Sequence, residues 1–162
     1  PADIDETPMK GELPRDLALR LAIGKARKIA HKNPQSYILA ADTVVGAGRR
    51  ILDKAEDELF ARKCLNTLSG RRHRVYGGIA IITPEGKEIT RLVETLVQFK
   101  RLTKNEIDTY IASKEWQGKA GGYAIQGLAE SYIKYIKGSY SNVVGLSLYD
   151  TMNMLNGAGY LK

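Results

Sequence analysis

A single carboxylate interrupts an otherwise apolar stretch of the sequence. The stretch "ILAADTVV", residues 38–45, holds Asp42 in its middle, shortly before a glycine-containing turn. Because a carboxylate among buried apolar side chains is costly without a partner, a metal ion or a task, Asp42 is a candidate functional residue. It could hold a divalent metal ion or take a proton from an attacking water as a general base. The alternative is a structural role, in which Asp42 caps the turn or pairs with an arginine, and the pattern alone favours neither.

Other charged residues could bind an anion or a metal ion. Lys25 falls on an apolar helical stripe, where its ammonium group needs an anion such as a substrate phosphate close by. Lys54 follows the apolar stretch and could reach the same edge of a sheet. In the alternative, Lys25 runs along the rim of the core with its charge in water, and Lys54 is an ordinary surface lysine. The acidic segment of Asp3, Asp5 and Glu6 could likewise ligate a metal ion or simply be solvated.

The segment "WQGKAGGYAIQG", residues 116–127, combines glycines with side chains suited to a nucleotide. The glycines let the backbone approach a ligand closely. Lys119 offers positive charge, whereas Tyr123 and Gln126 offer stacking and hydrogen bonds to a base. The sequence contains neither G-x-G-x-x-G nor a Walker loop, which excludes the two standard phosphate-binding loops.

The elements that position these residues can be predicted from periodicity and end signals. Pro14 and residues 15–32 predict a helix with proline in its first turn and an apolar stripe that includes Lys25. Residues 37–45 predict a short buried strand of the parallel type, with Asp42 near its carboxyl end, where ligands gather in open α/β sheets. After the turn, residues 49–52 are expected to run back beside this strand.

A second helix is predicted over residues 56–68, with Gly70 at its carboxyl-terminal cap. Its inward side chains are expected to be Leu59, Phe60, Cys64 and Leu68.

The rest of the chain predicts a hairpin and two further helices. Residues 73–83 and 87–99 are rich in β-formers and flank the turn "TPEG". Residues 103–106, "TKNE", form a capping box that begins a helix, residues 132–136 predict a short strand, and "SLYD" at residues 147–150 caps a final helix. Strands mixed with helices predict a single α/β domain with a mixed, twisted sheet flanked by helices.

Composition and charge narrow the class of protein and of partner. The 162 residues are 43% hydrophobic and 27% charged, as in one globular domain, and no apolar run reaches the length of a membrane span. The single cysteine, Cys64, excludes an internal disulfide and a Cys/His metal site and fits a reducing cytoplasm. The net charge of +7 indicates an anionic partner, either nucleic acid or a small phosphorylated ligand. A hydrolase triad of Ser69, His73 and Asp42 is set aside because no G-x-S-x-G motif is present.

Seven blocks of the sequence, spread over essentially the whole chain, form a recognisable set. They are "IDE" (4–6), the helix that carries Lys25, "AADTVV" (40–45), "DKA" (53–55), "LSGRRHRVY" (68–76), "WQGKAGGYAIQG" (116–127) and "GSYSNVVGL" (138–146). In order and spacing these blocks resemble the Maf family of nucleoside triphosphate pyrophosphatases. The individual residues of these blocks resemble those of the branch that acts on dTTP and UTP rather than those of the 7-methyl-GTP branch.

The resemblance implies an activity, a fold and partners. Family members cleave a nucleoside triphosphate between the α- and β-phosphates with a divalent metal cation, Mg²⁺ or Mn²⁺, and release the monophosphate and pyrophosphate. They are thought to clear modified pyrimidine nucleotides from the pool and have been linked to septum formation. Their fold resembles that of the inosine triphosphate pyrophosphatases, with a mixed sheet and a central cleft. Homodimers are common, and neither a membrane nor nucleic acid is the implied partner.

The resemblance also implies roles for individual residues. Asp42 matches the family's proton acceptor, and Glu6 matches a contact to metal or water, so that both are the implied metal ligands. Lys25 and Lys54 match lysines that neutralise the triphosphate. The positions tied to base selection are Thr43 and Gln126, beside Lys119 and Tyr123 of the glycine-rich segment.

The chain departs from the family pattern in three places. No Ser-x-Ser-Pro-Arg-Arg-type loop is present, and the sequence begins at Pro1 without an initiator Met, so we expect the Maf-like domain of residues 1–162 to lack its N-terminal strand and phosphate-binding loop. Ala55 stands where the family has proline. Residues 77–78 are Gly-Gly instead of Thr-Gly, and Ser147 replaces a proline. We expect the substitutions at Ala55, at residues 77–78 and at Ser147 to make loop geometry less restricted without removing a charged group.

Two other functions are kept as alternatives. A nucleic-acid-binding or division-linked interaction protein would use the positive charge and the basic cluster of residues 71–74. This alternative predicts that the affinity for nucleic acid depends steeply on salt and does not require Asp42. The sequence, however, contains no recognised binding motif and no pattern of aromatic residues for stacking on bases. A nucleotide-binding relative without turnover would bind the ligand and release no pyrophosphate.

Overall fold

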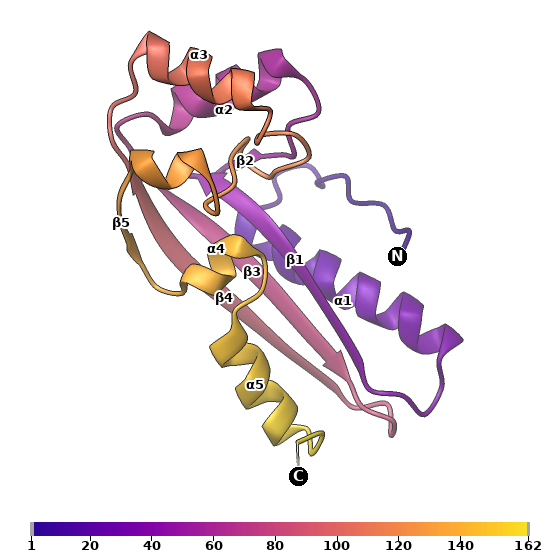
Figure 1. Ribbon diagram of the computed structural model, residues 1–162. Coiled ribbons are helices and arrows are strands. Elements are labelled where there is room, and N and C mark those ends of the chain that lie inside the picture. Colours follow the sequence, from indigo (N-terminus) through magenta and orange to yellow (C-terminus); the bar gives the residue numbers. More distant parts are fainter. Residues whose placement is uncertain (1, 162) are drawn as a thin grey trace.

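Five strands form one sheet at the centre of the molecule (Figure 1). Across the sheet they are β2 (Arg50–Leu52), β1 (Ile38–Ala47), β3 (Arg72–Ile82), β4 (Glu88–Phe99) and β5 (Ile133–Lys137). The computed structural model describes residues 2–161. Pro1 and Lys162 lie outside the described residues, so the expected start of the domain at Pro1 is not part of this description.

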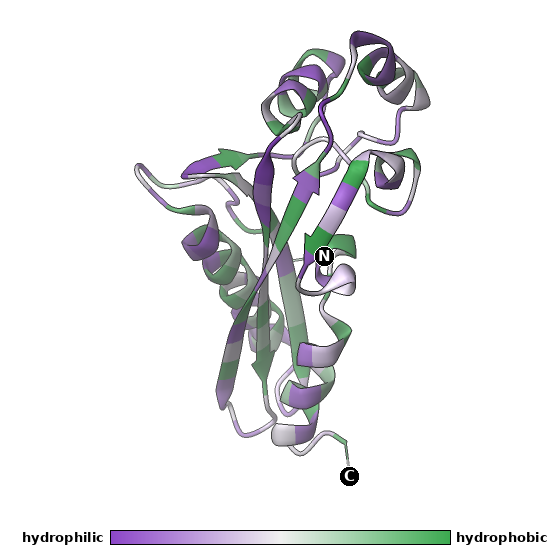
Figure 2. Cartoon of the chain, turned by 90° about the vertical axis from the view of Figure 1, so that its left-hand side faces the viewer, coloured by the Kyte–Doolittle hydropathy of each residue, from purple (hydrophilic) through white to green (hydrophobic). Residues whose placement is uncertain are grey.

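The predicted hairpin is confirmed, whereas the predicted parallel strand and mixed sheet are wrong. β3 and β4 pair antiparallel from Arg72 opposite Gln98 to Ile82 opposite Glu88. Within residues 2–161, β1 is antiparallel to both of its neighbours, and β4 is antiparallel to β5. The long apolar run of β1 reflects helices on both faces of the sheet (Figure 2), and burial on two faces carries no information about strand direction.

Asp42 lies in the middle of its strand. It is the fifth residue of the ten in β1 and lies opposite Gly78 of β3. The prediction that it lies near the carboxyl end of the strand is therefore wrong, because β1 continues to Ala47 and the chain turns only after that residue.

Helix α1 (Pro14–Lys32) covers one face of the sheet and begins, as predicted, with proline at its first position. Its buried residues are Pro14, Leu17, Ala18, Leu21, Ala22 and Ala26. Gly78 lets the helix lie directly on β3, because a Cβ atom there would come within 2.2 Å of the Ala18 carbonyl oxygen. Lys25 follows Ala18 by about two turns, and the close approach therefore sets it beside Asp42.

Three helices pack together at one end of the sheet (Figure 1). They are α2 (Glu58–Leu68), α3 (Lys104–Ser113) and the 3-10 helix η1 (Leu128–Tyr132). Leu65, Phe99 and Tyr110 are fully buried in their shared core. The predicted capping box is confirmed, since Thr103 and Glu106 each accept the backbone N–H of the other.

One inward side chain of α2 was predicted wrongly. Leu59 is 80% exposed. The helix begins at Glu58, after Asp57 has capped it by accepting the Phe60 N–H at 2.8 Å. The buried face of α2 consists of Ala61, Cys64, Leu65 and Leu68. Side chains on one face of a helix recur every three or four residues. Leu59 lies six residues from Leu65 and nine from Leu68, which places it on another side of the helix.

Helices α4 (Tyr140–Val144) and α5 (Leu148–Gly157) lie on the face opposite α1 (Figure 2). Ser147 caps α5 as predicted, and Met154 packs against Ile79 and Ile81 of β3. Helices α4 and η1 are short and were not predicted. No described helix is both long and apolar enough to cross a membrane.

Candidate active site

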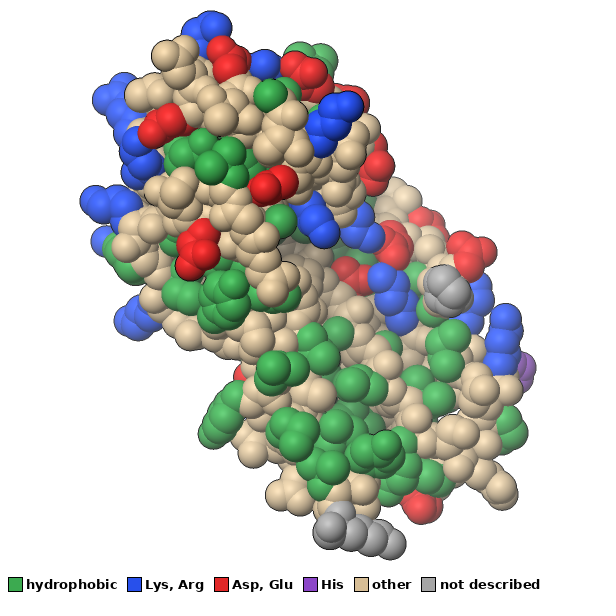
Figure 3. All heavy atoms as spheres, in the orientation of Figure 1, with side chains coloured by type: hydrophobic (Ala, Val, Ile, Leu, Met, Phe, Trp, Pro, Cys, Tyr) green, Lys and Arg blue, Asp and Glu red, His purple; other side chains and the backbone are tan. Residues whose placement is uncertain are grey.

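A pocket of about 320 Å³ opens beside the middle of β1. Figure 3 shows a hollow between the upper and lower parts of the molecule, with basic and acidic side chains along one side. Its walls come from α1, β1, the segment after β2, β3, the glycine-rich loop of residues 116–127, and α4. Six segments of the chain therefore meet around one space.

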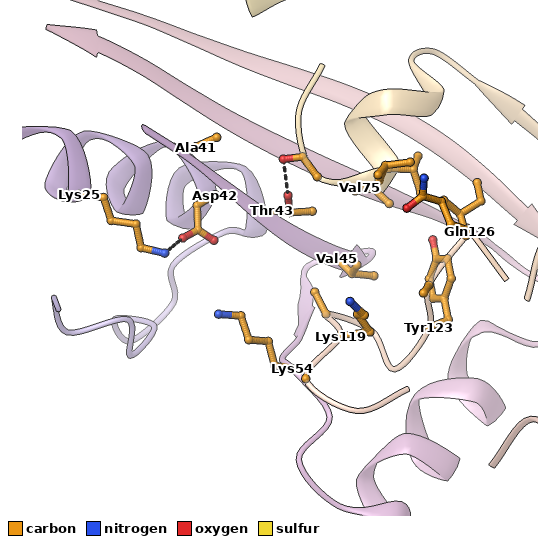
Figure 4. Close-up of a pocket in the computed structure, with 17 residues that line it drawn as sticks. Lys25, Ala41, Asp42, Thr43, Val45, Lys54, Val75, Lys119, Tyr123 and Gln126 are labelled. Carbon is orange, nitrogen blue, oxygen red and sulfur yellow. Dashed lines mark hydrogen bonds and ion pairs between the residues drawn. The ribbon is translucent and has the colours of Figure 1, made fainter. Parts of the chain in front are cut away.

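Charged residues gather at one end of this pocket. The Lys25 ammonium group donates a hydrogen bond to Asp42 Oδ2 and lies 2.7 Å from Glu6 Oε1. Lys54 Nζ donates to the other oxygen of Glu6 at 3.2 Å. Asp42 is only 8% exposed, so Lys25 supplies the partner that its burial requires. Four of the charged residues that the sequence singled out are thus brought together, and Figure 4 shows Lys25 and Asp42 pointing toward one another.

The network keeps Lys25 and Glu6 charged near neutral pH. Burial by itself lowers the pKa of Lys25, but hydrogen bonds with Asp42 and Glu6 outweigh it, and the net shift is upward. The hydrogen bond from Lys25 is the largest cause of the lowered pKa of Glu6. An incoming polyphosphate therefore meets ammonium groups whose present partners are carboxylates that it can replace.

Backbone hydrogen bonds fix Lys54 at the pocket. The N–H of Ala55 donates to the Lys119 carbonyl at 3.0 Å, and the N–H of Gly121 donates to the Leu52 carbonyl at 3.1 Å. The first of these bonds is one that proline could not make, which gives Ala55 a structural use at this departure from the family pattern. Gly121 has a positive φ of 69° and packs where a Cβ atom would lie 2.8 Å from Val45. Gly121 thus serves the packing of this loop against β1, and Gly122 serves its packing against α2, where a Cβ atom would lie 3.2 Å from the Cβ atom of Cys64.

The other end of the pocket has apolar walls and a few polar groups. Val45, Val75, Ile125 and Val143 line it together with the predicted substrate residues. Thr43 lies on β1 and donates a hydrogen bond to the Gly145 carbonyl at 3.3 Å. Lys119 and Gln126 are exposed at the rim, whereas Tyr123 is 5% exposed (Figure 4). Glu6 lines a neighbouring hollow that shares Asp42, Thr43 and Lys54 with this one.

The acidic segment before α1 contributes one side chain to the site. Asp5 accepts the backbone N–H of Thr7 at 2.9 Å, and Asp3 is exposed. Within residues 2–161 no group of three or more His, Cys, Asp or Glu side chains could hold a metal ion by itself. Glu6 and Asp42 share the Lys25 ammonium group, and they are the pair of carboxylates at the pocket.

Comparison with known proteins identifies the family to which this chain belongs. The profile of a family described as "Maf-like protein" matches residues 1–158, almost the whole chain. The chain belongs to the Maf family. Two curated relatives are both named "dTTP/UTP pyrophosphatase": the Paramagnetospirillum magneticum protein is 60% identical over 99% of this chain and 84% of its own length. The Caulobacter vibrioides protein is 58% identical over 99% and 83%.

One solved structure also aligns with this Maf protein. It is the crystal structure of a nucleoside-triphosphatase, dITP/XTP pyrophosphatase, from Mycobacterium abscessus. The alignment covers 98% of this chain and 76% of that chain, at 16% identity and a TM-score of 0.40.

Sequence reasoning missed two buried polar residues of this Maf protein. Asn142 is 1% exposed and donates hydrogen bonds to the Val75 carbonyl at 3.1 Å and to Thr95 Oγ1 at 3.0 Å, which holds α4 over the pocket. His73 is 2% exposed, and its Nε2 lies 2.7 Å from the Tyr123 hydroxyl oxygen. Asn142 stood in a matched block and His73 in a discarded triad, but their partners are distant in sequence, and no local pattern reveals them.

The burial of His73 makes the stability of this Maf protein depend on pH. Burial lowers the pKa of His73 to about 4, while the unfolded chain takes up a proton near its ordinary value of 6.5. Because the unfolded state binds the proton first, the free energy of unfolding falls as the pH drops through 6.5, by about 1.3 kcal/mol between about pH 7.5 and about pH 5.5. Urea unfolding at these two pH values measures this loss.

The only other histidine in the sequence provides the matched control. His31 lies exposed at the end of α1. We expect His73→Gln to flatten the pH dependence between pH 7.5 and 5.5, and His31→Gln to keep it. A wild-type slope in His73→Gln would contradict the assignment.

Proposed function

We propose that this protein hydrolyses dTTP and UTP, together with modified pyrimidine nucleotides, to the monophosphate and pyrophosphate, and so removes unwanted nucleotides from the pool. The observation that carries the proposal is the buried Asp42, held by Lys25 at the charged end of a pocket whose other end is apolar. The two ends suit the triphosphate and the base of one nucleotide. The names of the two curated relatives support the same activity.

The charged end supplies what cleavage of a phosphoanhydride requires. Asp42 takes the proton of a water molecule whose oxygen attacks the α-phosphorus, and the bond from that phosphorus to the bridging oxygen of the β-phosphate breaks. Pyrophosphate leaves with the electron pair. Lys25 and Lys54 exchange their carboxylate partners for phosphate oxygens and neutralise the charge of the triphosphate.

A divalent metal cation, Mg²⁺ or Mn²⁺, belongs to this proposal. Glu6 and Asp42 offer carboxylate oxygens, the ligands that such ions prefer, and both already contact one shared cation, Lys25. Two carboxylates suit an ion that takes its remaining ligands from water and substrate phosphates. When bound, the ion neutralises phosphate charge and orients the triphosphate.

The apolar end selects the base. Thr43 and Gln126 stand at the positions that the family resemblance ties to base selection, and both line the pocket. The valines around them offer an apolar surface for the flat faces of a pyrimidine. Lys119 at the rim adds positive charge for the phosphates.

The alternative of a nucleic-acid-binding protein would use a different surface. Arg71 and Arg72 of the basic cluster line a separate hollow with Arg49 and Arg50, which shares no lining residue with the Asp42 pocket. Binding there would be indifferent to Asp42 and steeply dependent on salt. Nucleotide binding without turnover is the second alternative, and a role in septum formation could accompany either.

The assembly and its location complete the proposal. The protein acts in the cytoplasm, which the single, buried and unpaired Cys64 supports. It acts as a homodimer, as the family resemblance implies. Leu148, Tyr149 and Met152 of α5 are largely exposed, and Figure 3 shows apolar side chains gathered on the lower part of this face, which offers a surface for such contact.

Pyrophosphate release from a panel of nucleotides tests the proposal. The full-length protein is assayed with dTTP, UTP, CTP, GTP and 7-methyl-GTP in the presence of Mg²⁺ or Mn²⁺. We expect the highest kcat/KM with dTTP and UTP and little turnover of 7-methyl-GTP. A folded protein that binds nucleotides and releases no pyrophosphate from any of them would instead favour the binding alternative.

A further inference from the structure

A buried pair of aromatic side chains lies behind the apolar end of the pocket. Tyr123 lines the pocket beside Gln126 (Figure 4), and its hydroxyl oxygen lies 2.7 Å from Nε2 of His73. Both residues are at least nine-tenths buried. Their rings and that of Phe99 pack edge to face, with centroids 5.0 to 5.5 Å apart. Packing on this side leaves the tyrosine ring little freedom to turn.

The surroundings of His73 decide which of its nitrogens carries the proton. Burial keeps the imidazole neutral, so it has one N–H. Its Nδ1 is buried and has no hydrogen-bond partner among residues 2–161. A proton on Nδ1 would leave an unsatisfied donor, which proteins avoid more strictly than an unsatisfied acceptor. The proton therefore sits on Nε2, and His73 donates to the Tyr123 oxygen.

This direction of donation leaves the Tyr123 hydroxyl hydrogen free. Burial raises the pKa of Tyr123, so the hydroxyl stays protonated. Within the described residues His73 is its one hydrogen-bond partner, and that partner is already the donor. Tyr123 lines the pocket, and its buried hydroxyl thus has a hydrogen to give and no acceptor among residues 2–161, which favours a ligand that brings one.

We propose that Tyr123 donates this hydrogen to a carbonyl oxygen of the pyrimidine base, and that His73 is the positioning residue that makes Tyr123 a donor. The inference rests on the proposed function and extends it to the atoms that read the base. Uracil and thymine carry carbonyl oxygens at C2 and C4, whereas adenine has none. The pair therefore favours keto pyrimidines and disfavours bases that present no carbonyl oxygen to the apolar end.

Sulfur-substituted substrates test which atom Tyr123 reads. UTP, 2-thio-UTP and 4-thio-UTP are compared in the full-length wild type and in Tyr123→Phe, since sulfur accepts a hydrogen bond more weakly than oxygen. We expect one thio substitution to lower the wild-type kcat/KM by about fivefold to tenfold. In Tyr123→Phe the kcat/KM for UTP falls about tenfold, mainly through KM, and the same thio substitution costs little more.

Each outcome has a defined meaning. Loss of the penalty for either thio analogue in Tyr123→Phe supports the proposal and names the carbonyl. Equal penalties in wild type and variant would overturn it, while a wild type that does not hydrolyse UTP would overturn the proposed function instead. Tyr135→Phe on β5, outside the pocket, serves as the matched control, and thermal unfolding verifies that each variant is folded.

Two His73 variants test its positioning role. His73→Leu cannot donate and should raise KM for UTP with the thio penalty reduced, as in Tyr123→Phe. His73→Gln keeps a side-chain N–H in reach and should recover part of the loss. Since the two residues act as one unit, the double variant His73→Leu, Tyr123→Phe should be no worse than Tyr123→Phe. Unchanged KM and thio penalty in a folded His73→Leu would overturn the role of His73.

Discussion

We expect Asp42→Asn to lower kcat for dTTP and UTP by about 10³-fold and to leave KM within a few-fold of the wild type. The reason is that asparagine has nearly the shape of aspartate but cannot take the proton of the attacking water, and general-base catalysis contributes roughly 10² to 10⁴. The ammonium groups of Lys25 and Lys54 still bind the triphosphate, so binding persists while chemistry stops.

Initial rates of pyrophosphate release and nucleotide affinity, measured on the same preparation, separate these effects. Asp16→Asn, exposed in the first turn of α1, is the matched control and should keep the wild-type kcat. A folded Asp42→Asn with wild-type kcat would remove Asp42 from the chemistry. Loss of nucleotide affinity with kcat unchanged at saturation would make Asp42 a binding residue only.

We expect Lys25→Met to lower kcat/KM for dTTP and UTP by about 10²-fold, the loss typical when one electrostatic contact to a developing negative charge is removed. Two causes act together. The triphosphate loses an ammonium partner, and Glu6 and Asp42 lose the cation between them, so they repel the substrate. Methionine keeps the apolar stem that packs along the core, which separates loss of charge from loss of packing.

The pH profile gives the same variant a second readout. Because the hydrogen bond from Lys25 is the largest cause of the lowered pKa of Glu6, its removal raises that pKa toward the ordinary value. Glu6, which acts in its deprotonated form, then becomes active only at higher pH. The acidic limb of the pH profile of kcat/KM therefore shifts to higher pH. Lys32→Met, at the exposed end of the same helix, should change neither quantity. A wild-type kcat/KM in Lys25→Met would show that the ion pair is structural.

Local signals in the sequence were sufficient for most of the elements. Proline at the start of α1, the "TPEG" turn between β3 and β4 and the capping box of α3 each specify backbone geometry within a few residues, and all three are confirmed. The direction of β1 was wrong because its apolar run reports burial on two faces, whichever way the neighbouring strands run. Leu59 was placed inward because apolar character was taken for a position on the buried face.

The candidate site divides in the same way. Charged side chains are rarely buried, so a carboxylate in an apolar strand and a lysine on an apolar helical stripe are unusual. Both can be recognised from the sequence without a structure. This unusual placement pointed to Asp42 and Lys25, whereas Glu6 and Lys54 were weaker candidates that the family resemblance supported. Which of them touch could not be read, because Glu6 and Lys54 are 48 residues apart in the chain and 3.2 Å apart in space.

By itself the sequence determined the family, the helices and strands with local end signals, and the charged residues whose burial demands a partner. Only the tertiary structure decided that Lys25 joins two carboxylates, that Gly78 admits α1 onto the sheet, and that His73 lies beside the hydroxyl of Tyr123, a residue that lines the pocket. The physical reason is range. Helix caps, turns and periodicity act between neighbours along the chain, whereas ion pairs, close packing and hydrogen-bond direction depend on which distant segments the completed fold brings together.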